Sequence, residues 1–239
     1  GRFPGMSVFE LPYLFRSGVE GSEAMWRMFE AGHLGGLDKM KVLGFYTTDV
    51  YGIHTKKKMT SLADVKGMKL RSAGPVQAGT VKHLGGVPIG MPITQATEAL
   101  SRGVVDGVIS GLSGLTIFRM QTIAKYHYAA PLSIAPLSAL MNKKKWDSLS
   151  KKVQQSMDKF GGRTMAKVTG GGFDKTAKIF KAKMDKASKH TYVTWDNANV
   201  DKARATMRPV YDTWIKGNKN GRMKLDALLK IITDIRDGK

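Results

Sequence analysis

The stretch Lys66–Ser113 reads KGMKLRSAGPVQAGTVKHLGGVPIGMPITQATEALSRGVVDGVISGLS, and its pattern decides the fold of the chain. It holds three short apolar runs, separated by two segments with helical spacing. The apolar runs are 68–70, 87–91 and 104–110, and the helical segments are 75–84 and 94–102. Short apolar runs that alternate with helices of about ten residues predict βαβ units and a parallel sheet. We therefore expect an α/β fold, which binds ligands at the carboxyl ends of its strands.

Arg71 directly follows the first apolar run, so it lies at the predicted carboxyl end of a strand. A guanidinium is permanently charged, and its planar fork matches a carboxylate through two parallel hydrogen bonds. An arginine in this position is either a surface ion-pair partner or, if it faces a cleft, a clamp for an organic acid. The residue pattern alone leaves both interpretations open.

Three motifs follow one another in this part of the chain: SLADVKGMKLR at Ser61–Arg71, LGGVPIGMP at Leu84–Pro92 and EALSRGVVDG at Glu98–Gly107. In this order and nearly without gaps, they resemble the DctP family, the substrate-binding proteins of TRAP (tripartite ATP-independent periplasmic) transporters. The resemblance continues weakly to about Gly161. It implies a two-lobed, class II-like periplasmic binding protein of the TRAP type, with mostly parallel sheets flanked by helices and a long connecting helix.

The resemblance also implies a division into lobes. Residues 1–50 and 137–190, with the long connecting helix, would form lobe 1, and residues 51–136 would form the carboxylate-binding lobe 2. A C-terminal strand and helices in 191–239 would pack across both lobes. Since residues 1–50 do not supply the first strand and helix of a binding lobe, we expect the start of lobe 1 to be missing from this sequence.

Family members clamp the substrate carboxylate with the arginine of a K-[LIV]-R motif, which is Arg71 here. A second arginine of many members falls on Tyr51, and the asparagine of their D-G-Q-E-N-P sequence falls on Ser110. Ser110 is therefore expected to do part of the work of that asparagine. These changes predict a less polar site, which favours a monocarboxylate with an apolar or aromatic body over a sugar acid.

Five further residues have two possible roles each. His54 lies in the sequence Gly52-Ile-His54-Thr55, which resembles a Gly-x-x-His-Thr pattern of one subgroup of the family. It either donates to a ligand oxygen or is a satisfied core histidine. The other four either line an apolar pocket or pack in the core: Tyr13, Phe15, Tyr46 and Ile93.

Signatures of other chemistries are missing from the sequence. The histidines at 33, 54, 83, 127 and 190 show no zinc-binding spacing, and the chain has no cysteine. Neither a G-x-S-x-G elbow nor a phosphate-binding G-x-x-x-x-G-K-[ST] loop occurs. Asp106 has no second carboxylate or histidine near it in sequence, so we expect it to stabilise a turn. We accordingly expect no metal, no cofactor and no enzymatic activity.

The formal net charge of the 239 residues is +20. Residues 137–239 carry 24 Lys and Arg against 10 Asp and Glu. Such an excess either forms a solvated lysine-rich helical exterior or attracts nucleic acid and anionic surfaces. No helix-turn-helix, RRM or zinc pattern supports specific nucleic-acid binding.

The resemblance and Arg71 together predict an extracytoplasmic, periplasmic binding protein. It would capture an organic acid between its lobes and deliver it to the membrane subunits of a TRAP transporter. The alternative function is that of a basic nucleic-acid-associated α/β protein. A monomer is expected in preference to a dimer, although some family members dimerise through the long helix in 150–190.

Overall fold

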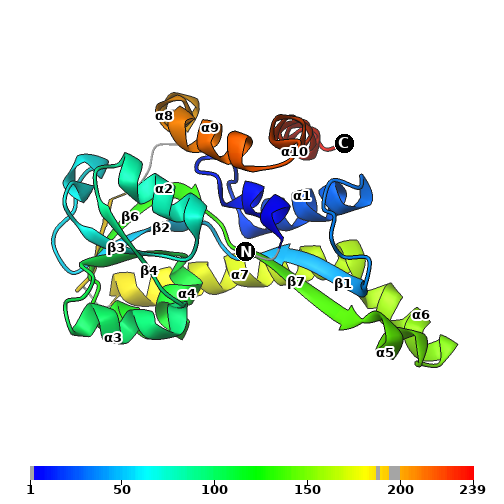
Figure 1. The fold of residues 1–239 in the computed structure, drawn as a ribbon. Helices are drawn as coiled ribbons and strands as arrows, with labels where there is room; N and C mark the ends of the chain where they lie inside the picture. Colours follow the sequence, from blue (N-terminus) through cyan, green and yellow to red (C-terminus); the bar gives the residue numbers. More distant parts are fainter. Residues whose placement is uncertain (1–2, 187–188, 194–199) are drawn as a thin grey trace.

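The structure is a computed structural model that describes residues 3–186, 189–193 and 200–239 (Figure 1). It contains a six-stranded sheet of order β4-β3-β5-β2-β6-β8 and a separate two-stranded ribbon of β1 and β7. In the sheet, β3 is parallel to β4 and β5, and β6 is parallel to β8, whereas β2 is antiparallel to both of its neighbours. The α/β class expected from the sequence is confirmed. The strands are β1 (Met40–Thr47), β2 (Tyr51–Thr55), β3 (Lys69–Ser72), β4 (Val87–Gly90), β5 (Gly107–Ser110), β6 (Tyr126–Ser133), β7 (Pro136–Asn142) and β8 (Thr191–Val193).

The stretch that decides the fold forms the parallel part of the sheet, as predicted. Its strands β3, β4 and β5 are joined by α2 (Pro75–His83) and α3 (Ala96–Ser101). Pro75 occupies the first turn of α2, where its missing N–H removes no helical hydrogen bond. Thr94 opens the helical segment 94–102, and its side chain predicts a cap for that helix. It does not cap α3, because it lies inside a 3₁₀ turn, Ile93–Gln95, that precedes the helix.

Two hydrophobic cores lie against the sheet. Successive side chains of a strand point to opposite faces, so Ile109 joins the first core and its neighbour Val108 joins the second. The first core contains residues of α2 and the second contains residues of α3 and of α4 (Leu112–Ile117). Figure 1 shows α2 on one side of the sheet and α3 and α4 on the other.

The long helix α7 (Gly162–Lys186) runs past both the ribbon and the sheet (Figure 1). The glycines at 161–162 and 170–172 predict two breaks in the helical stretch from about residue 150 to 190. The first break separates α7 from α6 (Lys151–Phe160). The second predicted break, at residues 170–172, is wrong. Gly170 lies inside α7 because α1 (Gly18–Glu30) packs so closely there that a Cβ at residue 170 would lie 2.4 Å from the Ser22 hydroxyl. Glycine is used at this position for close helix packing rather than for a turn.

Two further helix boundaries differ from the sequence prediction. Ser22 with Glu23 predicts a helix that begins at Ser22. The helix instead begins at Gly18, because the hydroxyl of Ser17 accepts the N–H of Glu20. The helical spacing of residues 115–124 predicts a single helix there. These residues are instead divided between the end of α4 and a 3₁₀ turn, Met120–Thr122. Arg119 separates the two, with a left-handed φ of 57°. The sequence also predicts strands at 126–132 and 137–141, on either side of a segment that contains Pro136. Both are confirmed, as β6 and β7.

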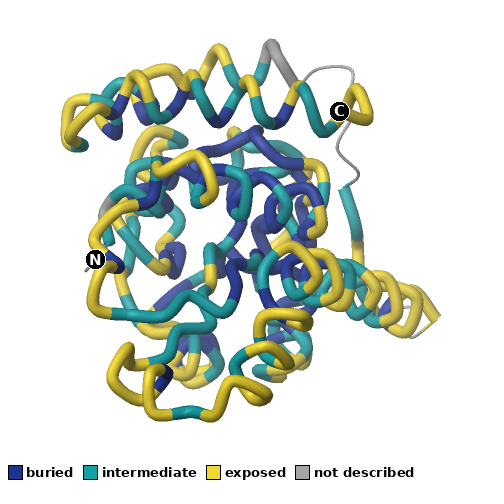
Figure 2. Tube along the Cα trace, turned by 90° about the vertical axis from the view of Figure 1, so that its right-hand side faces the viewer, coloured by how far each residue is buried: buried dark blue, intermediate teal, exposed yellow. Residues whose placement is uncertain are grey.

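The C-terminal helices α8 (Val200–Thr206), α9 (Arg208–Gly217) and α10 (Gly221–Arg236) form an outer layer. Figure 2 shows the outer side of this layer exposed, whereas the residues of α9 and α10 that face the body are buried. Within 191–239 the sequence predicts a strand at 192–195 and helices at about 198–216 and 222–236. Residues 194–195 of the strand and 198–199 of the first helix lie outside the described residues. Among the described residues, no helix has both the length and the hydrophobicity needed to cross a bilayer.

Candidate functional site

The candidate site lies at the edge of the sheet where the parallel strands end, which we call the carboxyl edge. Ser72 ends β3 and Ser110 ends β5. Because β2 runs in the opposite direction, its first residues meet this edge, and Gly52 is the register partner of Ser110. Residues far apart in sequence are thereby brought to one place.

Arg71 is buried one residue before this edge, with 4% of its surface exposed. Its Nε donates to the carbonyl oxygen of Met91 at 3.0 Å. Among the described residues, no carboxylate pairs with Arg71. Burial lowers the pKa of its guanidinium, and the one nearby ionisable group that counters this is the Tyr51 phenol. Arg71 is therefore not a surface ion-pair partner.

The electrostatics of Arg71 favour an anion. A buried charge without a counter-charge is costly, and a guanidinium remains charged at any ordinary pH. The guanidinium has five N–H donors, and the Nε–H donates to Met91. The N–H groups of the two terminal nitrogens remain to bind a carboxylate through two parallel hydrogen bonds. By contrast, Arg236 and Arg163 both pair with glutamates of the described chain.

Ser110 and Ile93 lie close together beside Gly114, at the start of α4. A Cβ placed on Gly114 would lie 2.8 Å from the Ser110 Oγ and 3.4 Å from the Ile93 Cδ1. Ser110 is fully buried, and its Oγ donates to the Gly111 carbonyl at 3.1 Å. Ser72 adds a buried hydroxyl with no hydrogen-bond partner among the described residues. This part of the edge thus combines hydroxyl groups with an apolar side chain.

His54 is a buried histidine, and both of its ring nitrogens form hydrogen bonds with other groups of the protein. Its Nε2 lies 3.0 Å from the Ser110 carbonyl oxygen, and its Nδ1 lies 3.0 Å from Nδ1 of His127. Burial lowers the pKa of His54 to about 4, so the ring is neutral at pH 7. This geometry is that of the satisfied core histidine, the second of the two roles expected from the sequence.

The three aromatic candidates lie elsewhere. Tyr13 and Phe15 belong to the first core, and the Phe15 ring stacks on Phe9 with centroids 5.9 Å apart. Tyr46, on β1 of the ribbon, is half-buried and stacks on Phe173 of α7 at 6.4 Å. The structure therefore brings Arg71, Ser110, Ile93 and His54 to the sheet near its carboxyl edge, and keeps Tyr13 and Phe15 in the hydrophobic core.

Two buried carboxyl groups near this edge were not identified from the sequence. Asp49 accepts hydrogen bonds from the hydroxyl and the N–H of Ser113, and burial raises its pKa to about 6. Glu10 has an unpartnered Oε2 beside Gly74, and burial raises its pKa to about 7. No motif marks either residue, since each is placed by segments distant in sequence. Both can carry a proton near neutral pH and donate a hydrogen bond.

Asp106 has a structural role, in agreement with the sequence. Its carboxylate accepts the N–H of Lys69 at 2.9 Å and lies 3.8 Å from Nζ of Lys57. It therefore holds the start of β3 against the turn before β5. Among the described residues, no group of three or more His, Asp or Glu side chains is arranged to hold a metal ion.

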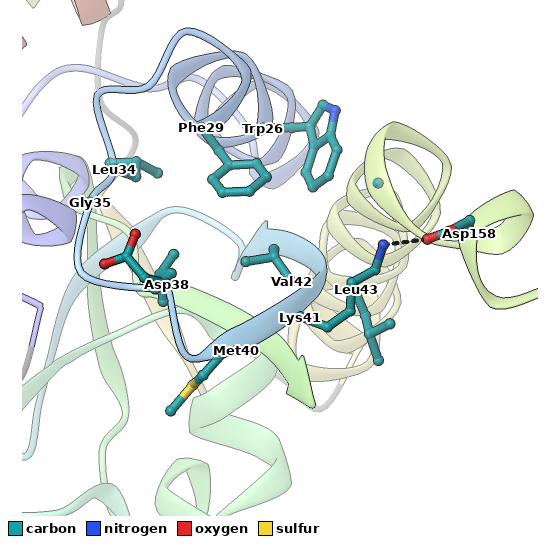
Figure 3. A pocket seen from close by; sticks show the side chains of 12 residues that line it. Trp26, Phe29, Leu34, Gly35, Asp38, Met40, Lys41, Val42, Leu43 and Asp158 are labelled. Atoms are coloured by element: carbon teal, nitrogen blue, oxygen red, sulfur yellow. Dashed lines mark ion pairs between the residues drawn. The ribbon is translucent and has the colours of Figure 1, made fainter. Parts of the chain in front are cut away.

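Two hollows of the described surface, one beside the ribbon and one beside the residues that follow β3, are not lined by Arg71. The pocket in Figure 3, about 480 Å³, lies between α1 and β1 and has an aromatic wall of Trp26 and Phe29. Its lysine, Lys41, is neutralised by Asp158 at 2.6 Å. The second hollow, about 810 Å³, lies between α2 and α9 and includes Glu10 in its lining. Neither hollow offers an unpaired buried cation of the kind seen at Arg71.

Comparison with known proteins gives a consistent result. The model of the family DctP, bacterial extracellular solute-binding protein, family 7, matches residues 1–217. A C4-dicarboxylate-binding periplasmic protein DctP of Rhodobacter capsulatus is 25% identical over 186 residues, which are 74% of this chain and 54% of that protein. The chain thus spans about half the length of the curated relatives it matches.

Solved structures extend this similarity to the fold. A marine metagenome TRAP solute-binding protein specific for aromatic acid ligands is 28% identical, with a TM-score of 0.91. The match covers 98% of this chain and 76% of that one, and the protein has been solved with metahydroxyphenylacetate and with 3-hydroxybenzoate. A TRAP periplasmic solute-binding protein from Bradyrhizobium, in complex with D-galacturonate, is 27% identical with a TM-score of 0.78, over 97% of this chain and 76% of that one. The two-lobed periplasmic binding fold expected from the sequence is confirmed.

Proposed function

Because the chain belongs to the DctP family of bacterial extracellular solute-binding proteins, we propose that it captures an organic acid outside the cytoplasm and delivers it to the membrane subunits of a TRAP transporter. It acts by binding and release, without chemical conversion of the ligand. The observation that carries the proposal is Arg71, a buried guanidinium at the carboxyl edge with no acidic partner among the described residues.

The ligand carboxylate binds to the free side of the Arg71 fork. The ligand lies between lobe 2, residues 51–136, and lobe 1, which contains residues 1–50 and 137–190. Closure of the lobes by a hinge motion removes the ion pair from water and strengthens it. The protein works in this form as a monomer in the periplasm.

The body of the ligand is apolar or aromatic. Tyr51 stands where a second arginine of many family members would be, and Ile93 lies next to Ser110. A sugar acid needs a hydrogen-bond partner for most of its hydroxyl groups, because unpaired polar groups are costly once buried. The similarity to a binding protein specific for aromatic acids supports this class of ligand, whereas the similarity to a galacturonate-binding protein supports the alternative of a uronic acid.

Isothermal titration calorimetry with 3-hydroxybenzoate and with D-galacturonate tests the proposal. We expect 3-hydroxybenzoate to bind the wild-type protein more tightly. Arg71→Ala should weaken that binding by about 2–5 kcal/mol, since it removes a buried charge-assisted pair. Arg71→Lys keeps the charge but loses the fork, so it should fall between the two.

The matched control is Arg102→Ala. The side chain of Arg102 is 73% exposed and paired with Glu98 four residues earlier, so its removal should leave the affinity unchanged. Equal affinities of the wild type and Arg71→Ala for a bound acid would refute the clamp. Tighter binding of galacturonate would overturn the aromatic class while leaving the carboxylate site in place.

A further inference from the structure

A row of polar side chains crosses the sheet from Arg71. In the strand registers, Arg71 of β3 is the partner of Val108 in β5, Val108 is the partner of His54 in β2, and His54 is the partner of His127 in β6. Register partners in neighbouring strands point to the same face of a sheet. Arg71 and the two histidines therefore share one face, and Arg71 lies two strands from His54, about 10 Å at the usual strand spacing.

Three histidines form a continuous chain of hydrogen bonds on this face. The Ser110 carbonyl oxygen lies 3.0 Å from Nε2 of His54, and Nδ1 of His54 lies 3.0 Å from Nδ1 of His127. Nε2 of His127 then lies 2.8 Å from Nδ1 of His190, just before β8. His54 and His127 are buried, and His190 is half-buried. The chain thus leads from the candidate site toward solvent.

The Ser110 carbonyl sets the direction of every bond in the chain. A carbonyl oxygen only accepts, so Nε2 of His54 carries a hydrogen, and Nδ1 of the neutral ring accepts. Nδ1 of His127 must then donate, which leaves its Nε2 as an acceptor for the Nδ1 hydrogen of His190. The one ring nitrogen with a lone pair that the chain does not use is Nε2 of His190, at the half-buried end.

From this arrangement we infer that His54, His127 and His190 are a proton-linked positioning device for the carboxylate site. His54 holds the Ser110 carbonyl and thereby the turn from β5 to α4 beside Arg71. The chain takes up a proton at His190, and a carboxylate bound to Arg71 favours that uptake. The link to a carboxylate rests on the proposed function, whereas the direction of the hydrogen bonds does not.

The charged groups around the chain come from the start of β6 and from α7. Lys125 adjoins β6, and Lys181 and Asp185 lie on α7, with the Lys181 ammonium 4.4 Å above the Tyr192 ring of β8. Both lysines oppose a positive charge on His127. Burial and Lys125 lower the pKa of His190, and Asp185 partly offsets this. Burial also lowers the pKa of His127 to about 2, so a proton is not retained in the middle of the chain.

Arg71 adds a further charge that opposes protonation, and its effect depends on the ligand. While the guanidinium is unpaired, its field disfavours a second cation on the same face. A bound carboxylate cancels that field, so protonation becomes easier. By reciprocity, protonation of the chain then favours carboxylate binding. The affinity should rise as the pH falls, by less than about tenfold for charges this far apart.

The first experiment reads the hydrogen positions directly in the ligand-free protein. Long-range ¹⁵N–¹H spectra of histidine-labelled protein at pH 7.5 distinguish the two neutral tautomers from the charged ring. We expect hydrogen on Nε2 of His54 and on Nδ1 of both His127 and His190. A hydrogen on Nδ1 of His54, or a charged ring in the chain at this pH, would overturn the inference.

The second experiment follows the same signals during an acid titration. His190 precedes β8, four strands from Arg71, about 20 Å at the usual strand spacing. Arg71→Gln removes the opposing charge as a bound anion would, so the midpoint for proton uptake at His190 should rise by about 0.2–0.6 pH unit. Arg102→Gln removes an exposed charge and should leave the midpoint unchanged. An unchanged midpoint in Arg71→Gln would overturn the link between the chain and the site.

Both experiments are independent of ligand binding. If the tautomers and the midpoint shift agree with the inference but no acid binds in calorimetry, the proposed function fails and the histidine chain stands. If 3-hydroxybenzoate binds through Arg71 but the midpoint does not move, the proposed function stands and the proton link fails. In the case where both hold, the affinity for 3-hydroxybenzoate should rise between pH 8 and pH 5.5.

Discussion

The six-stranded sheet and the β1–β7 ribbon place charged side chains in opposite ways. Strands β2 and β5 in the middle of the sheet are completely buried, whereas β7 of the ribbon has no buried residue. The sheet holds Arg71 without an acidic partner among the described residues, and the ribbon holds Lys41 paired with Asp158. An unpaired buried charge is costly and persists only where the surroundings are rigid. The comparison indicates that the binding chemistry belongs to the sheet.

The largest expected loss of stability comes from a substitution at Gly52 of β2, in the middle of the sheet. A Cβ at this position would lie 2.3 Å from the backbone oxygen of Tyr128 in the neighbouring strand, which cannot move without opening the ladder. Gly52→Ala should lower the free energy of unfolding by roughly 3 kcal/mol or more. The matched variant in the ribbon, Gly44→Ala, meets only the flexible side chain of Met165 and should cost about 1 kcal/mol. Urea denaturation of both variants tests this, and equal losses would contradict the contrast between sheet and ribbon.

The next effect concerns the ion pair that attaches the C-terminal layer to α1 on the ribbon side. Arg236 of α10 donates to Glu20 at 2.6 Å and to the Leu14 carbonyl at 2.8 Å. Arg236→Ala leaves the buried Glu20 carboxylate without its cation and should cost about 2–3 kcal/mol in chemical denaturation. Lys230→Ala, which removes an exposed pair within α10, should cost less than about 0.5 kcal/mol. A similar loss in both variants would show that the pair with Glu20 is no stronger than a surface pair.

A smaller effect comes from Glu10, whose pKa is raised by burial from 4.5 to about 7. The folded protein binds this proton more tightly than the unfolded chain, so the stability it contributes is present below pH 4.5 and is lost as the pH rises through 7. The glutamine of Glu10→Gln cannot ionise, so this variant does not lose stability as the pH rises. It should be more stable than the wild type by about 1–3 kcal/mol at pH 8. At pH 4 the two proteins should have nearly equal stability. Thermal unfolding at both pH values measures this, and a difference that does not depend on pH would exclude the titration of Glu10 as its cause.

The smallest effect is expected on α6, which extends from the ribbon and has no buried residue. Phe160 at its end is 66% exposed. Phe160→Ser should therefore change the free energy of unfolding by no more than about 0.5 kcal/mol. Phe45 of β1 in the ribbon is fully buried against Phe29, and Phe45→Ser is the matched change that should be severely destabilising. A clear loss in Phe160→Ser would mean that α6 is more closely packed than its exposure indicates.

Local patterns in the sequence predicted the parallel part of the sheet. The strands β3, β4 and β5 and the helices between them follow from periodicity, and Pro75 marks a helix start through its own geometry. The cap of α1 was misplaced because both Ser17 and Ser22 are suitable capping residues. Sequence spacing cannot show which of the two has the non-helical backbone that a cap requires.

Long-range arrangements were beyond prediction from the sequence. Glycines 170–172 predict a helix break, and only the close contact with α1 shows why Gly170 remains helical. The histidine chain joins residues 63 and 73 positions apart, and no local motif encodes such contacts. Arg71 was identified through its motif, but its lack of an acidic partner among the described residues became visible only in the fold.

Helix α7 contacts the two regions at different points along its length. Met165 packs against Gly44 of the ribbon, and Met184 packs in the second core beneath the sheet. Each residue of a helix turns its successor by about 100° and advances it by about 1.5 Å. One residue inserted after Gly172 would thus rotate Met184 out of its core while Met165 stayed in place. The helix fixes both the spacing and the relative angle of the two regions, so its length can change only by nearly whole turns.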